Sequence, residues 1–171
     1  YTIAGYRTTT SQYYDAMLLH TDLNGDTLWS KVIGGPDYDD ANTIKQLADG
    51  GYILGGQSII NAGNASQYLI RTDINGDTLW TRRLTSTGPA NIEYLTLVSD
   101  GFVFVGSTNP AGISDDGYIV KTDTFGIVQW AKIYGGSEPD DFHRVEKTTD
   151  GGFIICGTTS SSGALNPNMW L

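Results

Sequence analysis

The sequence has little of several things, and each scarcity narrows what the chain can be. It has one cysteine, Cys156, so no disulfide can form within the chain. Lysine and arginine number 10 against 19 aspartates and glutamates, and binding a phosphate backbone requires clustered positive charge, so we expect no nucleic-acid partner. No run of about 20 apolar residues occurs, which argues against membrane insertion. The two histidines and the single cysteine form no zinc-type cluster.

Helical periodicity is absent as well, and in its place three sequence markers recur about every 50 residues. A turn aspartate, a tryptophan and a glycine that ends an apolar strand repeat in step with one another. They are Asp22, Asp73 and Asp123; Trp29, Trp80 and Trp130; and Gly5, Gly56, Gly106 and Gly157. Because three independent markers share one period, the chain consists of copies of a single unit.

Each unit contains signals for four short strands. In the second copy we expect them at 42–48, 52–58, 67–72 and 78–84, with Asn75-Gly76 supplying the positive-φ residues of a hairpin turn. Four antiparallel strands per repeat predict an all-β fold and a β-propeller with WD-repeat-like blades; a β-solenoid is the alternative.

The repeat also predicts how the chain is divided. Residues 1–171 read as one propeller fragment with phases of approximately 1–40, 41–91, 92–141 and 142–171, a partial ring of about three to four blades. This gives about 14 strands, in groups of three, four, four and three. Since a blade needs neighbours to bury its faces, we expect the natural protein to continue at both ends, with neighbouring blades as partners.

The repeated residues are interpreted as structural. The tryptophans are predicted to pack between blades, with a sugar-stacking platform as the alternative. The turn at Asp22, Asn24 and Asp26 resembles the start of an EF-hand loop, but Thr27 stands where that loop needs glycine and no glutamate follows at its twelfth position. We therefore predict that these aspartates cap backbone N–H groups.

The loops that lead from one unit to the next are acidic at 34–40 and 135–141 and neutral in the middle copy, which carries Ala90 and Asn91. Solvated surface loops are the simplest interpretation. No cofactor is expected; if calcium binds at all, it should bind at Asp37, Asp39 and Asp40 or at Glu138, Asp140 and Asp141. These loops share a face with the loops between the second and third strands. The candidate ligand-binding residues on this face are Asp37, Tyr38, Asp39, Asp40, Asn64, Asp115, Asp116, Glu138, Asp140 and Asp141.

Taken together, these motifs resemble β-propeller repeats of large secreted proteins from Bacteroidota and related bacteria, including SBBP-type repeats. The match is carried by Gly135-Gly136, Asp140-Asp141, residues 150–157, and Lys121-Thr122-Asp123 with Gly126 and Trp130. The turn at 72–80 is similar to the Asp-box of sialidases, with one extra residue before the tryptophan. The resemblance implies an extracellular or cell-surface bacterial protein.

The expected function is a non-catalytic binding or scaffold module that recognises protein or carbohydrate through its loop face. One alternative is a fragment of a sialidase-like glycoside hydrolase. Arg82 and Arg83 are neighbours on one strand and face opposite ways, so they cannot form the arginine cluster of a sialidase. No insertion breaks the repeat either, so we expect no enzyme. A second alternative is a calcium-stabilised adhesin segment.

Overall fold

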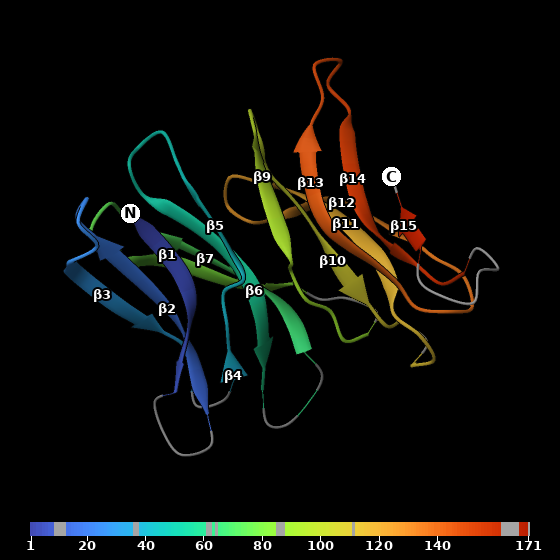
Figure 1. The fold of residues 1–171 in the computed structure, drawn as a ribbon, viewed down its shortest axis with the longest axis horizontal. Helices are drawn as coiled ribbons and strands as arrows, with labels where there is room; N and C mark the ends of the chain where they lie inside the picture. Colours follow the sequence, from blue (N-terminus) through green and yellow to red (C-terminus); the bar gives the residue numbers. More distant parts are fainter. Residues whose placement is uncertain are drawn as a thin grey trace. The chain divides into compact units, whose positions relative to one another are not determined.

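A computed structural model of the chain describes residues 1–8, 13–35, 38–60, 63, 65–84, 88–110, 112–161 and 168–170. Within these residues the regular structure consists of β-strands, all paired antiparallel, as the sequence predicts for an all-β fold (Figure 1). A search of the same residues for an apolar helix of membrane-spanning length finds none. The strands fall into four sheets, which group as two compact units, residues 1–84 (unit 1) and 85–171 (unit 2).

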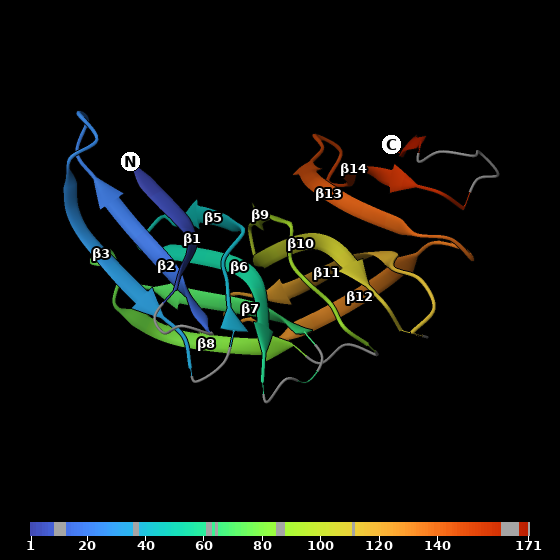
Figure 2. The same ribbon diagram turned by 60° about the horizontal axis from the view of Figure 1, so that its bottom comes forward.

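Unit 1 contains two sheets stacked on each other (Figure 2). The first has the order β1–β2–β3, and its strands are Thr2–Thr8, Tyr14–Thr21 and Thr27–Ile33. The second has the order β4–β6–β7–β8, with β5 also paired to β6; these strands are Tyr38–Asp39 (β4), Thr43–Gln46 (β5), Tyr52–Ile59 (β6), Ala65–Thr72 (β7) and Thr78–Leu84 (β8).

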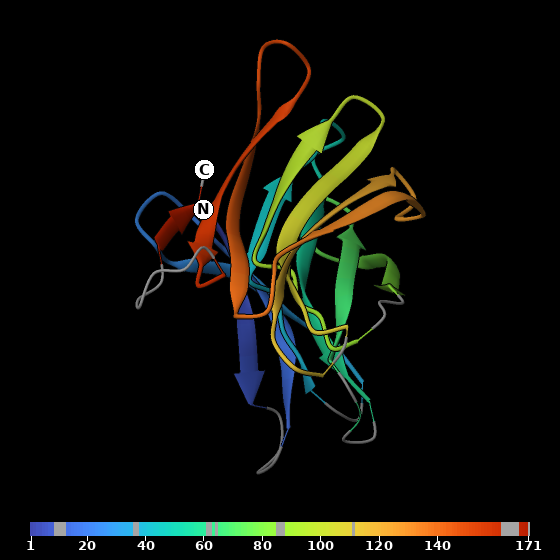
Figure 3. The ribbon, with the colours of Figure 1, turned by 90° about the vertical axis from the view of Figure 1, so that its right-hand side faces the viewer.

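Unit 2 repeats this arrangement. Its first sheet has the order β12–β11–β10–β9, and the strands are Tyr94–Val98 (β9), Gly101–Thr108 (β10), Asp116–Asp123 (β11) and Val128–Tyr134 (β12). Its second sheet has the order β13–β14–β15, from Asp140–Lys147, Phe153–Thr159 and Asn168–Trp170. Figure 3 shows the β13–β14 hairpin, in orange, beside β9 and β10.

The core of each unit lies between its two sheets. In unit 1 the buried cluster is Ala16, Leu18, Ile33, Ala41, Tyr52, Leu54, Tyr68 and Ile70, with Trp29 packed against it. In unit 2 it is Val103, Val105, Ile119, Phe142 and Val145, with Trp130 and Phe153 against it. Each of these tryptophans meets an aromatic residue of the following repeat, since both the Trp29–Tyr52 and the Trp130–Phe153 ring centroids are 6.4 Å apart. The predicted packing role is therefore observed for these two, although all three repeated tryptophans are half-buried.

A β-bulge places the tryptophans on the core face. In each of three sheets the register shifts at one repeat position, between His20 and Thr21 in the first copy and between Lys121 and Thr122 in the third. In the first copy His20 pairs with Trp29 and Thr21 pairs with Thr27, so Leu28 is the unpaired extra residue.

Three of the four repeated glycines, Gly56, Gly106 and Gly157, lie where another backbone segment passes close by, whereas nothing lies within 4 Å of the Cβ site of Gly5. A Cβ on Gly56 would lie 2.2 Å from the carbonyl oxygen of Asp40. Gly106 meets the carbonyl oxygen of Asn91 at 2.5 Å, and Gly157 that of Asp141 at 1.9 Å. A side chain at these positions would overlap main-chain atoms, which explains why glycine recurs there.

Two details of the predicted strand plan are wrong. The first strand of the second repeat is divided, because β4 and β5 pair with different parts of β6, and the second sheet therefore has five strands where four were expected. Tyr38 and Asp39 pair with β6, and Asp140 begins β13, so the repeat boundaries predicted after 40 and 141 fall a few residues late.

Candidate functional site

The repeated turn aspartates cap their own turns. Asp73 Oδ1 accepts hydrogen bonds from the backbone nitrogens of Asn75 at 2.8 Å and Asp77 at 2.9 Å. Asp22 and Asp123 make the same pair of bonds at the same distances in their own copies. Oδ1 of each repeated aspartate therefore accepts two backbone N–H groups, as expected of an Asx-type turn.

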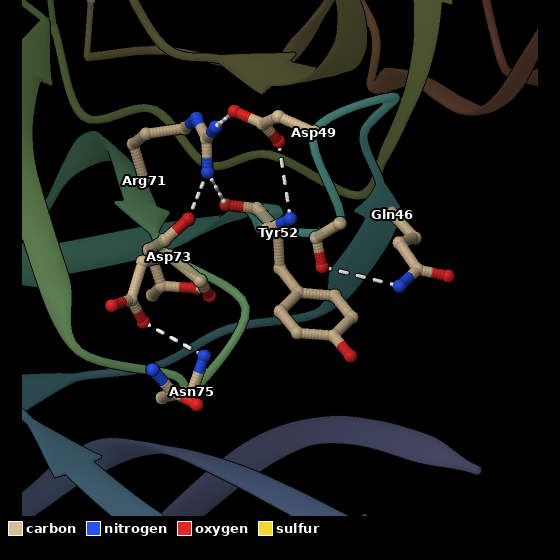
Figure 4. A network of polar contacts seen from close by, with 9 residues as sticks. Gln46, Asp49, Tyr52, Arg71, Asp73 and Asn75 are labelled. Atoms are coloured by element: carbon tan, nitrogen blue, oxygen red, sulfur yellow. Dashed lines mark hydrogen bonds and ion pairs between the residues drawn. The ribbon is translucent and has the colours of Figure 1, made fainter.

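A second repeated contact joins the third strand to the turn between the first two strands. The Arg71 guanidinium forms an ion pair with Asp49 and also donates to the carbonyl oxygens of Tyr52 and Thr72 (Figure 4). In the third copy Lys121 pairs with Asp100 at 2.6 Å. In the first copy the equivalent His20 stacks on Trp29 and shares a hydrogen bond with Thr2. These side chains hold the turn end of each sheet, the end that carries the capped hairpin turns.

The opposite end, where β1, β4 and β6 approach their connecting loops, is called the loop end. The acidic loops at this end were expected to be solvated, but three of their aspartates are buried. Asp39 and Asp140 are 1% exposed, and Asp40 is 7% exposed. The reason is that strand pairing begins earlier than predicted and carries these carboxylates inside. Asp140 and Asp141 are consecutive residues of β13, so their side chains point to opposite faces of the sheet. No group of three or more potential metal ligands occurs among the described residues.

In unit 1 the buried Asp39 carboxylate sits in a polar junction between the two sheets. Its Oδ2 accepts from the backbone nitrogen of Gly35 at 2.8 Å, and its Oδ1 lies 3.5 Å from Arg83 Nη2. Arg83 also donates from Nε to Ser58 Oγ at 2.7 Å. Asp15 lies against the same glycine pair, since a Cβ on Gly34 would lie 2.2 Å from Asp15 Oδ1. The Gly-Gly sequence makes room for that carboxylate.

In unit 2 the same junction has two carboxylates and Ser161 in place of an arginine. Asp140 Oδ2 accepts from Gly136 N at 2.9 Å and from Ser161 Oγ at 2.7 Å. A Cβ on Gly135 would lie 2.1 Å from Asp116 Oδ1 and 2.9 Å from Asp140 Oδ2, so the two carboxylates face each other across this glycine. Asp116 Oδ1 has no hydrogen-bond partner in the part of the chain that the structure describes.

The two carboxylates of unit 2 differ in their affinity for protons. Burial raises the pKa of Asp116, and the charges of Asp140 and Asp115 add to the rise. Burial also acts to raise the pKa of Asp140, but hydrogen bonds from Ser161, Thr159 and Gly136 outweigh it, and the net shift is downward. Asp140 is 1% exposed, so its carboxylate lies inside the junction.

Asp40 and Asn91 occupy equivalent positions in successive repeats, and each accepts a hydrogen bond from a backbone nitrogen of the neighbouring strand. Asp40 Oδ1 accepts from Gln57 N at 2.9 Å, and Asn91 Oδ1 accepts from Ser107 N at 2.9 Å. The neutral middle copy therefore keeps the contact with an amide oxygen. In the fourth copy Asp141 is half-buried, burial raises its pKa, and His143 Nδ1 lies 3.7 Å from its Oδ2.

The remaining predicted site residues differ in how the structure places them. Asp37 and Asn64 lie outside the described residues. Asp115 and Glu138 are exposed, and their backbone oxygens accept from Asp140 N at 2.7 Å and from Ser161 Oγ at 3.0 Å. Tyr38 is half-buried and belongs to an aromatic group that the sequence did not predict.

This group, here called the tyrosine row, consists of Tyr6, Tyr14, Tyr38 and Tyr13 at the loop end of unit 1. Neighbouring ring centroids are 4.8 Å apart for Tyr6–Tyr14, 4.9 Å for Tyr14–Tyr38 and 5.2 Å for Tyr38–Tyr13. Tyr6 is 62% exposed, and the other three are half-buried. Three separate segments supply the rings, so only the folded chain brings them together. The available sequence signal was that all four positions depart from the repeat.

The two cavities described lie between sheets within a unit. One of about 330 Å³ in unit 1 is lined by Tyr1, Thr2, His20, Ile44, Gln46 and Tyr52. The other, of about 400 Å³ in unit 2, is lined by Ile119, Trp130, Lys132, Tyr134, Phe153 and Ile155. The second borders the core of unit 2, since Ile119 belongs to the buried cluster and Trp130, Phe153 and Ile155 pack against it.

Comparison with known proteins informs the fold alone. No protein-family model matches the chain, and no curated protein matches it. A crystal structure of a protein of unknown function from Bacteroides caccae is similar, with a TM-score of 0.55 and 11% sequence identity over 96% of this chain. The chain spans 57% of that protein, little more than half its length.

Proposed function

We propose that the chain is part of a β-propeller and serves as a non-catalytic binding module outside a bacterial cell. The observation that carries this proposal is the contrast between the two ends of unit 1. At the turn end the repeated polar side chains cap turns or form ion pairs within the sheet. At the loop end, four tyrosines that the repeat does not require form a partly exposed row.

The propeller is favoured by three features together: a unit of about 50 residues, antiparallel sheets that follow one another along the chain, and sheets stacked face to face within each unit. A radial arrangement of four or more such sheets is what we infer for the whole protein. The resemblance to repeats of secreted bacterial proteins supports the extracellular location.

A binding role is favoured over catalysis because Asp116 and Asp140, two carboxylates that face each other, meet inside the junction of unit 2, where Asp140 is buried. Hydrolysis of a glycoside needs two carboxyl groups that flank a bound sugar. Variation of loop residues on a constant frame is instead the usual way for a repeat protein to acquire a ligand.

The test is a screen of the purified chain on peptide and glycan arrays, with variants at the two ends. We expect at least one ligand class to bind, and Tyr38→Ser to weaken it. Leu23→Ser is the control, because Leu23 is 86% exposed on a capped turn at the other end. Absence of binding to every probe, or turnover of a chromogenic glycoside, would contradict the proposal.

A further inference from the structure

The first sheet of unit 1 has a free edge that its counterparts do not have. In the other three sheets the strand equivalent to β1 has a partner on each side: β6 lies between β5 and β7, β10 between β9 and β11, and β14 between β13 and β15. Among the described residues β1 pairs with β2 alone. Since the main-chain bonds between Tyr1 and Thr21 fix the alternation, the N–H and C=O groups of Thr2, Ala4 and Tyr6 point away from β2 and lie along the free edge.

The strand that occupies this edge in the other sheets is anchored by an aspartate or asparagine. In the second repeat the carbonyl oxygen of Asp40 faces the Cβ site of Gly56. Asp40 N donates to Gln57 O at 3.0 Å, and Asp40 Oδ1 accepts from Gln57 N at 2.9 Å. Asn91 makes the same two bonds to Ser107, at 3.2 Å and 2.9 Å. The added strand is thus held at the repeated glycine and at the residue that follows it.

Two apolar residues follow this anchor at fixed positions. The first comes directly after it and is buried in each copy, with an exposure of 5% or less: Ala41, Ile92 and Phe142. The second comes four residues after the anchor and pairs with the residue two before the glycine; the pairs are Ile44–Leu54, Leu95–Phe104 and Val145–Ile155. With Asp141 as the anchor of the fourth copy, the three added strands share the pattern Asp/Asn-apolar-x-x-apolar.

The matching contact groups of β1 are uncovered. Gly5 is its repeated glycine, and no other atom of the described residues lies within 4 Å of its Cβ site. Ile3 occupies the position of Leu54 and Phe104, yet it is 51% exposed, whereas those two residues are 0% exposed. Tyr6 follows the glycine, so its main-chain N–H and C=O stand at the repeat position whose N–H and C=O bond to the anchor in the second and third repeats. The free edge therefore has the groups that an added strand contacts in the other sheets.

We infer that the free edge of β1 is a docking site for an extended segment of a partner protein that carries the pattern Asp/Asn-apolar-x-x-apolar. The segment adds to the sheet as a strand antiparallel to β1. Its Asp or Asn bonds to the main chain of Tyr6, its carbonyl group crosses Gly5, and its second apolar residue covers Ile3. A second copy of this chain is a poor donor, because its own segments 40–44, 91–95 and 141–145 are held in their sheets. The contacts are made by main-chain groups, a glycine and an isoleucine, so the inference does not depend on which ligand the tyrosine row binds.

The test uses fluorescence anisotropy of the whole chain with a labelled peptide of residues 39–48, which contains the pattern from Asp40 to Ile44. We expect saturable binding. The Asp40→Asn peptide should bind within about twofold of the original, because Asn91 makes the same bond in the third repeat. The Asp40→Ala peptide should bind about fivefold to tenfold more weakly, because Tyr6 N then has no side-chain acceptor. Gly5→Ala in the chain should weaken binding at least about tenfold, because its methyl group takes the space of the crossing carbonyl.

Ser30→Val is the matched control, because it adds side-chain atoms at an exposed position of β3, the opposite edge of the same sheet, and should leave binding unchanged. Amide hydrogen exchange of the unaltered chain provides a readout that does not depend on how the variants fold. The peptide should slow exchange at Ala4 and Tyr6, which face the free edge, and not at Gly5. No binding of the peptide, or equal binding to the Gly5→Ala chain, would overturn the inference. Self-association of the chain that Gly5→Ala abolishes would place a second copy on this edge and overturn the partner segment.

Discussion

The junctions of the two units use one backbone design with different charge compensation. In each, a Gly-Gly pair that follows one strand makes room for an aspartate of the strand paired beside it, and the second glycine donates a hydrogen bond to a buried aspartate at the start of the next repeat. In unit 1 the buried aspartate also forms an ion pair with Arg83, and in unit 2 it accepts a hydrogen bond from Ser161. The carboxylate count is equal, but only unit 1 has a described cation within the junction. The comparison teaches that the glycines and aspartates are the constant part and the compensating group is the variable part.

The largest effect should come from breaking the part that both units share. Gly56→Ala places a methyl group 2.2 Å from a main-chain oxygen that cannot move without disrupting β4 and β5, so we expect a loss of about 3 kcal/mol in the free energy of unfolding. Gly157→Ala should act alike in unit 2.

Gly5→Ala is the control, because it occupies the same repeat position and nothing lies within 4 Å of its Cβ site. Its effect should stay within about 0.5 kcal/mol. The measurement is urea denaturation followed by tryptophan fluorescence. Equal effects of the three changes would refute the close-approach explanation.

The next prediction compares Arg83 with Ser161, the groups that compensate the buried aspartates of the two junctions. Arg83→Met should cost about 2 kcal/mol, because Asp39 is left buried with a single backbone donor and Ser58 loses its partner. Ser161→Ala should cost about 1.5 kcal/mol, since it removes an uncharged hydroxyl that donates to the Asp140 carboxylate and to the Glu138 carbonyl oxygen. Amide hydrogen exchange should report the first change in β6 and the second in β14. A cost for Ser161→Ala above that for Arg83→Met would reverse the comparison.

A stabilising change is expected at Asp116. Its pKa is raised in the folded chain, so ionisation at neutral pH opposes folding, and the penalty is relieved as the pH falls through the raised value. Asp116→Asn should therefore raise the free energy of unfolding at pH 7 by about 1 kcal/mol. The gain should shrink on acidification and vanish below the ordinary aspartate pKa of about 3.9.

Asp15→Asn tests the matched position in unit 1, where Arg83 already lies in the junction, and should give a smaller gain. Thermal unfolding at several pH values measures both variants. A gain for Asp116→Asn that persists unchanged at pH 3 would show that charge is not its cause.

The smallest effect is expected for Asp40→Asn. Asn91 already makes the equivalent bond to a backbone nitrogen at the same distance of 2.9 Å, so the amide oxygen suffices. The free energy of unfolding should change by less than about 0.5 kcal/mol. Asp40→Ala, which leaves Gln57 N without its acceptor, should cost about 1–3 kcal/mol in the same denaturation experiment.

The sequence predicted those features that depend on neighbouring residues. Most of the antiparallel strands, the positive φ of Gly76 (78°) and the capping role of Asp73 follow from local patterns and are found as expected, whereas the division of the first strand of the second repeat into β4 and β5 was not predicted. It failed at the acidic segments, because Asp39 and Asp140 have the composition of a surface loop and their burial depends on strands far away in the sequence.

One signal for the junctions was present in the sequence and was not used. The Gly-Gly pairs occur together with Asp15 and Asp116, and in the middle copy both features are replaced, by Thr85-Ser86 and Ser66. The tyrosine row had a weaker signal, since departure from a repeat shows that a residue is special without showing which others it meets. Its rings come from β1, β2 and β4, and their proximity is a property of the fold.

The bulge before each tryptophan has a consequence for how such a chain can grow by gene duplication. Side chains on a strand alternate between two faces, so deleting Leu28 would turn Trp29 from the core to the solvent. The bulge must therefore be inherited together with its strand. The third repeat is one residue shorter than the second, and the missing residue is the second glycine of the Asp-Gly-Gly turn, which contracts to Asp100-Gly101. The one-residue difference in length thus falls at a turn, where it inverts no side chains, whereas the same change within the bulged strand would move the tryptophan to the other face.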